Sequence, residues 1–205
     1  RDIWSIEGIT NYYNDLALLR ANRIKPAKFL EFLAAQLQKL DGIPGRLAQS
    51  LEESSFDAWI RLYRSHENNL NSTVSYYLKG HVVAALLDVF LEEASAGTKS
   101  LDDVMRYLWQ HHAKERGYPE GKFDELVFEA TGIEVATQFD KWVRRAEELD
   151  YDEILALAGL TLKKSHGKDA AGPWIGVKTR AVGDRLIVSE VRSDVHKTGF
   201  LSPGD

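Results

Sequence analysis

The sequence predicts a mostly α-helical chain that ends in a small β-rich module. Residues 1 to about 158 lack the alternation of strands, and their apolar residues recur at three- and four-residue steps. From Gly159 the composition changes: seven of the 15 glycines lie in the last 47 residues, where eight Lys and Arg outnumber five Asp and Glu. We therefore expect a helical domain over residues 1–158 and a separate β-rich domain over residues 159–205.

The composition limits the classes of function. Of the 205 residues, 44% are hydrophobic and 28% are charged, a balance that can bury a core and predicts a soluble protein. No apolar run approaches the roughly 20 residues of a membrane span, so no membrane partner is expected. The net charge of -5 and the lack of a basic stripe argue against nucleic acid. The chain has no cysteine, which excludes disulfides and thiolate metal sites but does not distinguish cytoplasm from periplasm.

Two helices are expected near the start of the chain. The first ends near Asn22, and Glu7 lies off its apolar stripe. The second begins at Pro26, which suits a first helical turn, and runs through Leu40 to a stop at Asp41-Gly42. The expected apolar faces consist of Ile6, Ile9, Tyr13, Leu16 and Leu19 in the first helix and of Phe29, Leu30, Leu33, Leu37 and Leu40 in the second.

The remaining helices surround one central helix. Apolar residues between 56 and 63 predict a short helix, and Ser72 or Thr73 is a plausible cap for the next helix, which runs to about Ala96. Residues 82–91 of that helix are apolar on nearly every side, which is typical of a helix packed at the centre of a domain. Ser100 opens a helix to about Arg116, and two shorter helices follow near 122–131 and 134–146. In the tail, residues 174–177 and 186–191 read as strands, with Gly183-Asp184 as a turn.

One short motif points to metal chemistry. Trp4-Ser5-Ile6-Glu7-Gly8 resembles the Trp-x-x-Glu-Gly segment of zinc peptidases, in particular of the glycyl aminopeptidase family, in which this glutamate is the third metal ligand. Such enzymes need three protein ligands and one open position for a water. The resemblance implies that Glu7 is a zinc ligand. The alternative is that Glu7 is an ordinary solvated residue, as most helical glutamates are.

A second motif implies a catalytic tyrosine. Tyr77-Leu78-Lys79-Gly80 resembles a segment of aminopeptidases of the same zinc clan, in which the tyrosine donates its hydroxyl to the oxyanion that forms during attack. The resemblance implies this role for Tyr77. The alternative is that Tyr76 and Tyr77 are core aromatic residues at the start of a helix.

The resemblance to the glycyl aminopeptidase family covers almost the whole chain, with further similar segments at residues 50–60, 100–105 and 147–160. It implies the multi-helix half of a gluzincin-type (thermolysin-like) peptidase domain of bacterial type, which removes glycine or alanine from the N-termini of peptide substrates. No His-Glu-x-x-His motif occurs in the 205 residues. We therefore expect the two histidine ligands and the general base to lie upstream of Arg1, and this chain by itself to be inactive and to bind no zinc. His81, directly after the Tyr-x-Lys-Gly segment, could line the cleft, but we interpret it as a solvated residue without a role.

The tail resembles the first part of a bacterial PDZ domain. Ile175-Gly176-Val177 would form the carboxylate-binding loop, which holds a peptide C-terminus while the adjacent strand pairs with the peptide. Residues 193–199 would form a short helix ended by Gly199. We read the module as incomplete, with an unpaired edge that predicts a strand-swapped or edge-paired oligomer or a mobile tail. The alternative is an ordinary small β-unit whose glycines only make turns.

Two other functions compete with the peptidase. A non-catalytic peptide-binding or scaffold protein could keep the fold and the PDZ-like module without the metal. A plain helical interaction domain explains the periodicity but not the joint presence of Glu7 and Tyr77.

Overall fold

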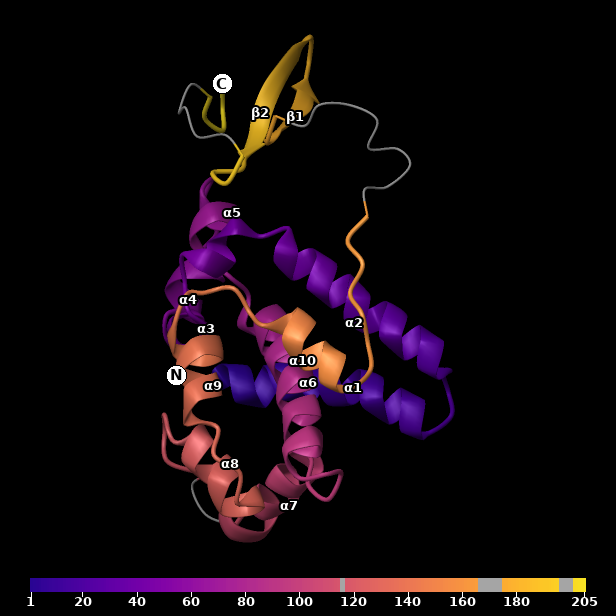
Figure 1. The fold of residues 1–205 in the computed structure, drawn as a ribbon. Helices are drawn as coiled ribbons and strands as arrows, with labels where there is room; N and C mark the ends of the chain where they lie inside the picture. Colours follow the sequence, from indigo (N-terminus) through magenta and orange to yellow (C-terminus); the bar gives the residue numbers. More distant parts are fainter. Residues whose placement is uncertain (115–116, 166–174, 196–200) are drawn as a thin grey trace.

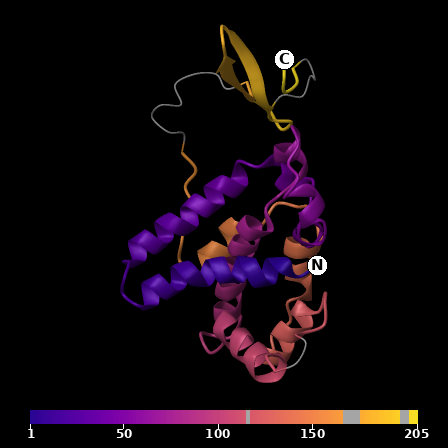
Figure 2. The ribbon, with the colours of Figure 1, turned by 180° about the vertical axis from the view of Figure 1, so that it is seen from behind.

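The computed structural model describes residues 1–114, 117–165, 175–195 and 201–205, which form a helical body and a β-hairpin (Figure 1). In the body, α1 (Ile3–Arg20) and α2 (Pro26–Asp41) pack against the long helix α6 (Tyr76–Ala94). Seen from behind, α1 lies across α6 (Figure 2). The start and end of α2 agree with the prediction from Pro26 and Asp41-Gly42.

The centre of the body is α6, as its composition predicts. Every residue from Lys79 to Asp88 is buried. The segment Asn69–Ala94 is long and apolar enough to cross a membrane, contrary to the expectation that no such run exists, but 72% of its apolar window is buried inside the fold. A helix in the core of a folded domain can be as apolar as a membrane-spanning helix, so the composition of this segment fits a core helix.

Two glycines let α1 and α6 cross at very short range. A Cβ atom on Gly8 would lie 2.5 Å from the carbonyl carbon of Gly80, and one on Gly80 would lie 3.0 Å from the carbonyl oxygen of Trp4. Contacts this close leave no room for a side chain, so backbone packs on backbone. Gly8 and Gly80 therefore fix where α1 meets the central helix.

The buried face of α1 differs from the predicted stripe. Ile6 is 60% exposed, and Tyr12 is buried where Tyr13 was expected. The crossing at Gly8 turns the helix so that residues on either side of the glycine face the core, a shift that a count of large apolar residues does not reveal. The buried residues of α1 are Trp4, Ser5, Gly8, Ile9, Tyr12 and Leu16.

Short helical turns connect α2 to α6: η1 (Pro44–Leu47), α3 (Leu51–Phe56), α4 (Ala58–Arg61) and α5 (Asn69–Ser72). Ser50 and Glu53 form a capping box at α3. The cap of α6 is Ser75, whose hydroxyl accepts from the Leu78 N–H, so the prediction of Ser72 or Thr73 was wrong. Ser72 instead ends the short helix α5.

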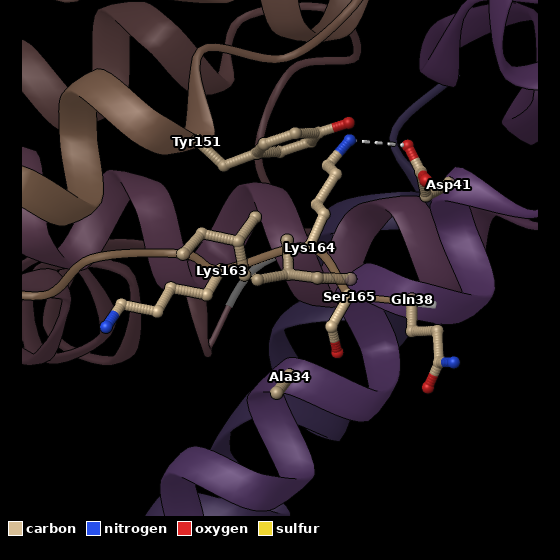
Figure 3. Close-up of a pocket in the computed structure, with 9 residues that line it drawn as sticks. Ala34, Gln38, Asp41, Tyr151, Lys163, Lys164 and Ser165 are labelled. Carbon is tan, nitrogen blue, oxygen red and sulfur yellow. Dashed lines mark hydrogen bonds and ion pairs between the residues drawn. The ribbon is translucent and has the colours of Figure 1, made fainter. Parts of the chain in front are cut away.

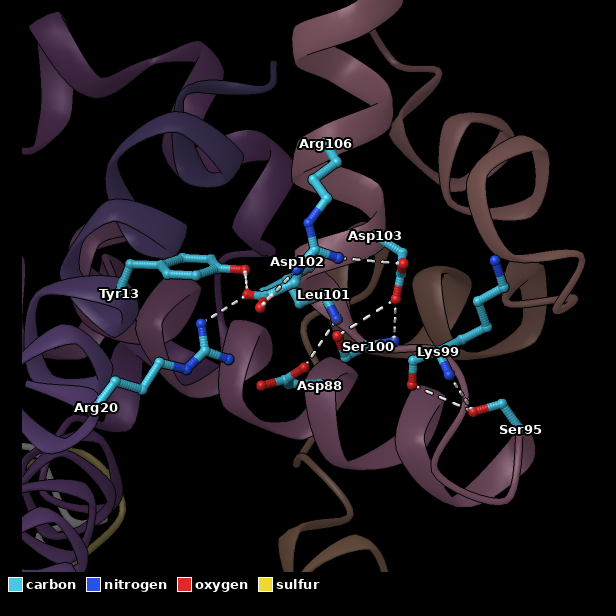
Figure 4. Close-up of polar contacts among 10 residues, drawn as sticks. All are labelled: Tyr13, Arg20, Asp88, Ser95, Lys99, Ser100, Leu101, Asp102, Asp103 and Arg106. Carbon is cyan, nitrogen blue, oxygen red and sulfur yellow. Dashed lines mark hydrogen bonds and ion pairs between the residues drawn. The ribbon is translucent and has the colours of Figure 1, made fainter.

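Polar contacts join α1 and α6 to α7 (Leu101–His112) (Figure 4). Buried Asp88 accepts hydrogen bonds from the Tyr12 hydroxyl at 2.6 Å and from the Leu101 N–H at 2.8 Å. Asp102 accepts from the Tyr13 hydroxyl at 2.6 Å. Ser100 caps α7 as predicted, but the helix ends at His112 rather than near Arg116, which lies outside the described residues.

The body ends with α8 (Phe123–Thr131), α9 (Ala136–Phe139), the π-helical turn η2 (Asp140–Arg144) and α10 (Tyr151–Leu157). The first three agree with the two short helices expected near 122–131 and 134–146, whereas α10 was not predicted as a separate helix. Trp4 packs edge-on against Phe123 and Phe139, with ring centroids 5.5 and 5.8 Å apart. This segment therefore covers the start of α1.

The tail forms an antiparallel hairpin of β1 (Val177–Val182) and β2 (Arg185–Val191). Gly183 in the turn has a φ of 59°, which glycine adopts without strain. The first strand begins at Val177, not at Trp174, which lies outside the described residues. Of the helix expected over residues 193–199, residues 196–199 also lie outside the described ranges.

One side chain joins the hairpin to the helical body. The amide nitrogen of Asn71 donates to the Val191 carbonyl at 2.7 Å, and its amide oxygen accepts from the Ser193 N–H at 2.9 Å. Asn71 thus pairs with the end of β2 as a backbone amide would, from the turn α5 that precedes Tyr77 in the chain.

Candidate active site

Glu7 lies in α1 directly before the glycine of the α1–α6 crossing and is half-buried. The described part of the chain offers it no ion-pair partner and no hydrogen-bond donor to its side chain. A carboxylate in this setting is free to bind a cation or a polar ligand. Its negative charge acts on two tyrosine hydroxyls, those of Tyr63 and Tyr77.

Tyr77 stands in the first turn of α6, where several contacts hold the chain. The Val74 N–H donates to the Gln49 side chain at 3.0 Å, the Ser54 hydroxyl donates to the Val74 carbonyl, and Ser75 caps the helix. A hydrogen bond with Tyr63, and further the charge of Glu7, raise the pKa of Tyr77 above its ordinary value. Tyr77 therefore stays protonated and can donate.

Three tyrosine side chains, those of Tyr63, Tyr76 and Tyr77, form a cluster, and the charge of Glu7 acts on two of them. The Tyr63 and Tyr76 hydroxyls are 2.9 Å apart, and the rings of Tyr76 and Tyr77 stack with centroids 4.5 Å apart. Hydrogen bonds with Tyr76 and Tyr77 lower the pKa of Tyr63. Sequence reasoning assigned Tyr63 only to a short helix, because nothing in its local pattern links it to a residue after the intervening loop.

A polar groove opens next to this cluster. It has a volume of about 400 Å³ and lies between α1, α2 and the start of α6. Tyr77 is one of its lining residues, so the groove includes the tyrosine that the motif identified as a candidate. Its lining residues are Asn11, Asn14, Asp15, Gln36, Lys39, Ser75, Tyr77, Leu78 and His81.

His81 is not the solvated residue that the sequence suggested. It is 3% exposed and lines the groove, with its Nε2 atom 4.0 Å from Asp15 Oδ2. Burial lowers the pKa of His81, against a smaller opposing effect of Asp15. The imidazole is therefore neutral at pH 7. In the sequence, only the position of His81 one turn after Tyr77, on the inner side of α6, could have indicated that it lines the groove.

Lys79 of the Tyr-x-Lys-Gly motif is 1% exposed and its amine has no hydrogen-bond partner among the described residues. Burial lowers the pKa of Lys79 to about 8, with smaller effects from Glu148, Arg46 and Glu53. Lys79 does not line the groove that Tyr77 and His81 share.

A second cavity, of about 330 Å³, lies between α2 and the segment after α10 (Figure 3). Lys164 pairs with Asp41 at 3.0 Å and lies over the ring of Tyr151. These contacts attach residues 162–165 to the body. The cavity contains none of the residues that the motifs singled out.

The described residues do not make a complete metal site. No group of three or more His, Cys, Asp or Glu side chains that could hold a metal ion occurs in them. Within the described ranges Glu7 is a single carboxylate that belongs to no such group.

The three residues of the expected carboxylate-binding loop stand at the entrance to the hairpin. Ile175 is 61% exposed, Gly176 has a φ of 75°, and Val177 begins β1. The Gly176 carbonyl accepts from the Arg192 N–H at 2.7 Å, which closes the loop against the end of β2.

Comparison with known proteins agrees with the motifs. The family model of M61 glycyl aminopeptidase matches residues 1–83, which include Glu7, the α1–α6 crossing and Tyr77. The crystal structure of an aminopeptidase N family protein from Idiomarina loihiensis superposes with a TM-score of 0.87 and 29% sequence identity. The match covers 98% of this chain and 37% of that chain, so the present chain spans little more than a third of that protein. No curated protein matches the sequence. The chain is therefore similar to the M61 glycyl aminopeptidase family over residues 1–83 and, in its fold, to an aminopeptidase N family protein.

Proposed function

We propose that this chain is the helical part of a zinc aminopeptidase that removes glycine or alanine from peptide N-termini, with Glu7 and Tyr77 in its active site. The observation that carries the proposal is the position of these two residues. Gly8 and Gly80 bring α1 and α6 into backbone contact, and the charge of Glu7 then acts on the Tyr77 hydroxyl. Two motifs that are 70 residues apart in sequence therefore share one place in the fold.

Glu7 would supply one carboxylate ligand to the zinc ion. A bound zinc ion makes water acidic enough to attack a peptide carbonyl. The other ligands and the general base would come from outside the described residues, since the 205 residues contain no His-Glu-x-x-His motif. For this reason we propose that the chain alone neither hydrolyses peptides nor binds zinc.

Tyr77 would donate a hydrogen bond to the carbonyl oxygen of the scissile bond as negative charge develops there. Its raised pKa favours the protonated hydroxyl that this role requires. The loss of one such donor typically costs about 10²- to 10³-fold in turnover.

The test uses the full-length protein that contains this chain, with alanyl and glycyl substrates. We expect Glu7→Ala to lose bound zinc, measured by elemental analysis, and Tyr77→Phe to keep zinc but lose about 10²-fold in turnover. Glu31→Gln on α2 and Tyr107→Phe on α7 serve as matched controls. Full zinc content in Glu7→Ala, or unchanged turnover in Tyr77→Phe, would contradict the assignment.

The competing function is a non-catalytic peptide-binding or scaffold protein. It predicts a full-length protein that binds no zinc at Glu7, so the same elemental analysis separates the two. A plain helical interaction domain gives no reason for Glu7 and Tyr77 to meet.

For the PDZ-like module, we propose that Ile175, Gly176 and Val177 bind peptide C-termini. The positive φ of Gly176 supports a turn that can present backbone N–H groups. Within the described ranges β1 pairs with β2 alone, which supports strand addition by a peptide or by a second copy of the chain. Binding of a labelled peptide with a free C-terminus tests the first possibility, and light scattering tests the second.

A further inference from the structure

The groove between α1, α2 and α6 has the chemistry of a site for a peptide main chain. Eight of its nine lining residues carry polar side chains, and Leu78 is the exception. Amide and hydroxyl groups dominate, and these can both donate and accept hydrogen bonds. Such a lining matches the alternating N–H and C=O groups of an extended peptide better than it matches an apolar side chain.

His81 indicates that the groove takes a ligand. Its side chain is 4% exposed and the imidazole makes no hydrogen bond to any other described residue. The closest charged group, Asp15 Oδ2, is 4.0 Å away, beyond hydrogen-bonding distance. Because His81 lines the groove, its ring nitrogens are open to a ligand there. A peptide amide offers one donor and one acceptor, which are the groups that a neutral imidazole needs.

The position of the groove relative to Glu7 decides which part of a substrate it would hold. Asp15 lies eight residues after Glu7 in α1, which corresponds to about 12 Å along the helix. The N-terminal amine of an aminopeptidase substrate is only one residue, about 3.5 Å of extended chain, from the scissile bond. A substrate whose scissile carbonyl lies at Glu7 and Tyr77 therefore cannot place its amine beside Asp15. With the scissile carbonyl at Glu7, the groove would lie on the side of the leaving peptide.

Its length and its charge define the ligand further. About three extended residues span the distance from Glu7 to Asp15. Lys39 lines the groove from α2, is exposed, and makes no ion pair with a described residue. An ammonium group at this place attracts a carboxylate.

We propose that this groove binds the leaving-group portion of short peptides, through hydrogen bonds from His81, Asn11 and Asn14 to the main chain and an ion pair from Lys39 to the C-terminal carboxylate. The assignment rests on the proposed function for its orientation. It makes the protein selective for peptides of about four residues with a free C-terminus.

The test measures binding to the 205-residue chain itself, so it depends on neither zinc nor turnover. The probe is the peptide Gly-Ala-Ala-Ala, with the same peptide amidated at its C-terminus for comparison. In NMR titrations of isotopically labelled chain, we expect the imidazole nitrogens of His81 and the side-chain amides of Asn11 and Asn14 to shift. The amidated peptide should bind about tenfold more weakly, as expected for the loss of one charged hydrogen bond.

Three variants complete the test. Asn14→Ala should weaken both peptides, and Lys39→Met should weaken the free acid about tenfold without affecting the amide. Lys28→Met, an exposed change on the same helix as Lys39, should affect neither. Asn14 and Lys39 are exposed, so their replacement leaves the core intact.

Absence of a His81 shift, or equal weakening of both peptides by Lys39→Met, would overturn the proposal. The outcome is independent of the zinc test. If Glu7→Ala loses zinc but His81 does not shift, the proposed peptide site in the groove is wrong and the peptidase assignment stands. If His81 shifts but Glu7→Ala retains normal zinc, the peptide site stands and the catalytic assignment is wrong.

Discussion

Lys79 places a cationic side chain in the core beside the site. It is 1% exposed, and Glu148, Arg46 and Glu53 are the charged groups that act on its amine. Burial in a region of low polarity penalises the charged form, which explains why the pKa of Lys79 falls to about 8 from its ordinary value of 10.5. Between these two pH values the unfolded chain binds more protons than the folded chain.

The consequence for stability can be measured. Below pH 8 the folded state carries the whole penalty of the buried charge, about 3 kcal/mol, and this penalty disappears as the pH rises through 10.5. We expect Lys79→Met to raise the free energy of unfolding at pH 7 and to have a smaller effect at pH 10, measured by denaturant titration. Lys28→Met at an exposed position is the control. A gain that is the same at both pH values would contradict the assignment of a buried charge.

At the level of elements, the crossing of α1 and α6 builds the site. The Trp-x-x-Glu-Gly and Tyr-x-Lys-Gly motifs each end in a glycine, and these two glycines are the residues in contact. They bring the helices close enough for Glu7 and the Tyr77 hydroxyl to act on one another.

Gly8→Ala tests this contact. The new methyl group would lie 2.5 Å from the Gly80 backbone, so the helices would have to separate. Overpacking of a core costs about 1–3 kcal/mol, and we expect at least this loss in the free energy of unfolding. The matched control is Gly42→Ala at the end of α2, where φ is -72° and the nearest atom lies 3.3 Å away. Equal stability of the two variants would show that the helices do not touch at Gly8.

For the whole molecule, the relation between the hairpin and the body depends on Asn71. Its side-chain amide donates to Val191, the last residue of β2, and accepts from Ser193, two residues after β2 ends. These two hydrogen bonds attach the hairpin to the turn α5, from which the chain leads to Tyr77. The position of the β-module and that of the candidate site are therefore connected through one short segment.

We expect Asn71→Ala to release the hairpin without unfolding the helices, because α5 is on the surface and has no buried residues. Hydrogen exchange at the Ser193 amide should accelerate about tenfold, as expected for the loss of one hydrogen bond, while exchange in α6 stays unchanged. Ser72→Ala, which removes a local bond to the Asn68 carbonyl, is the control. Slow exchange at the Ser193 amide in Asn71→Ala would show that Asn71 does not attach the hairpin to the helical body.

The sequence predicts the elements that have local signals. Pro26 and Asp41-Gly42 delimit α2, Ser100 caps α7, and the apolar residues 82–91 identify the core helix. These features depend on neighbouring residues, so periodicity and capping rules apply. The buried face of α1 was predicted only in part. Ile9 and Leu16 are buried as expected, but Ile6 is exposed, since the face depends on the contact of Gly8 with a residue of another helix.

Sequence alone determined the helical class and the candidates Glu7 and Tyr77, because residue types and short motifs express backbone preference and side-chain chemistry. Tertiary structure decided what stands around them. The approach of two glycines brings the helices of Glu7 and Tyr77 into contact, the chain after α4 brings the Tyr63 hydroxyl to that of Tyr76, and packing buries His81 in the wall of a groove. These arrangements arise from contacts between helices that are distant in sequence, and no local pattern of residues contains them.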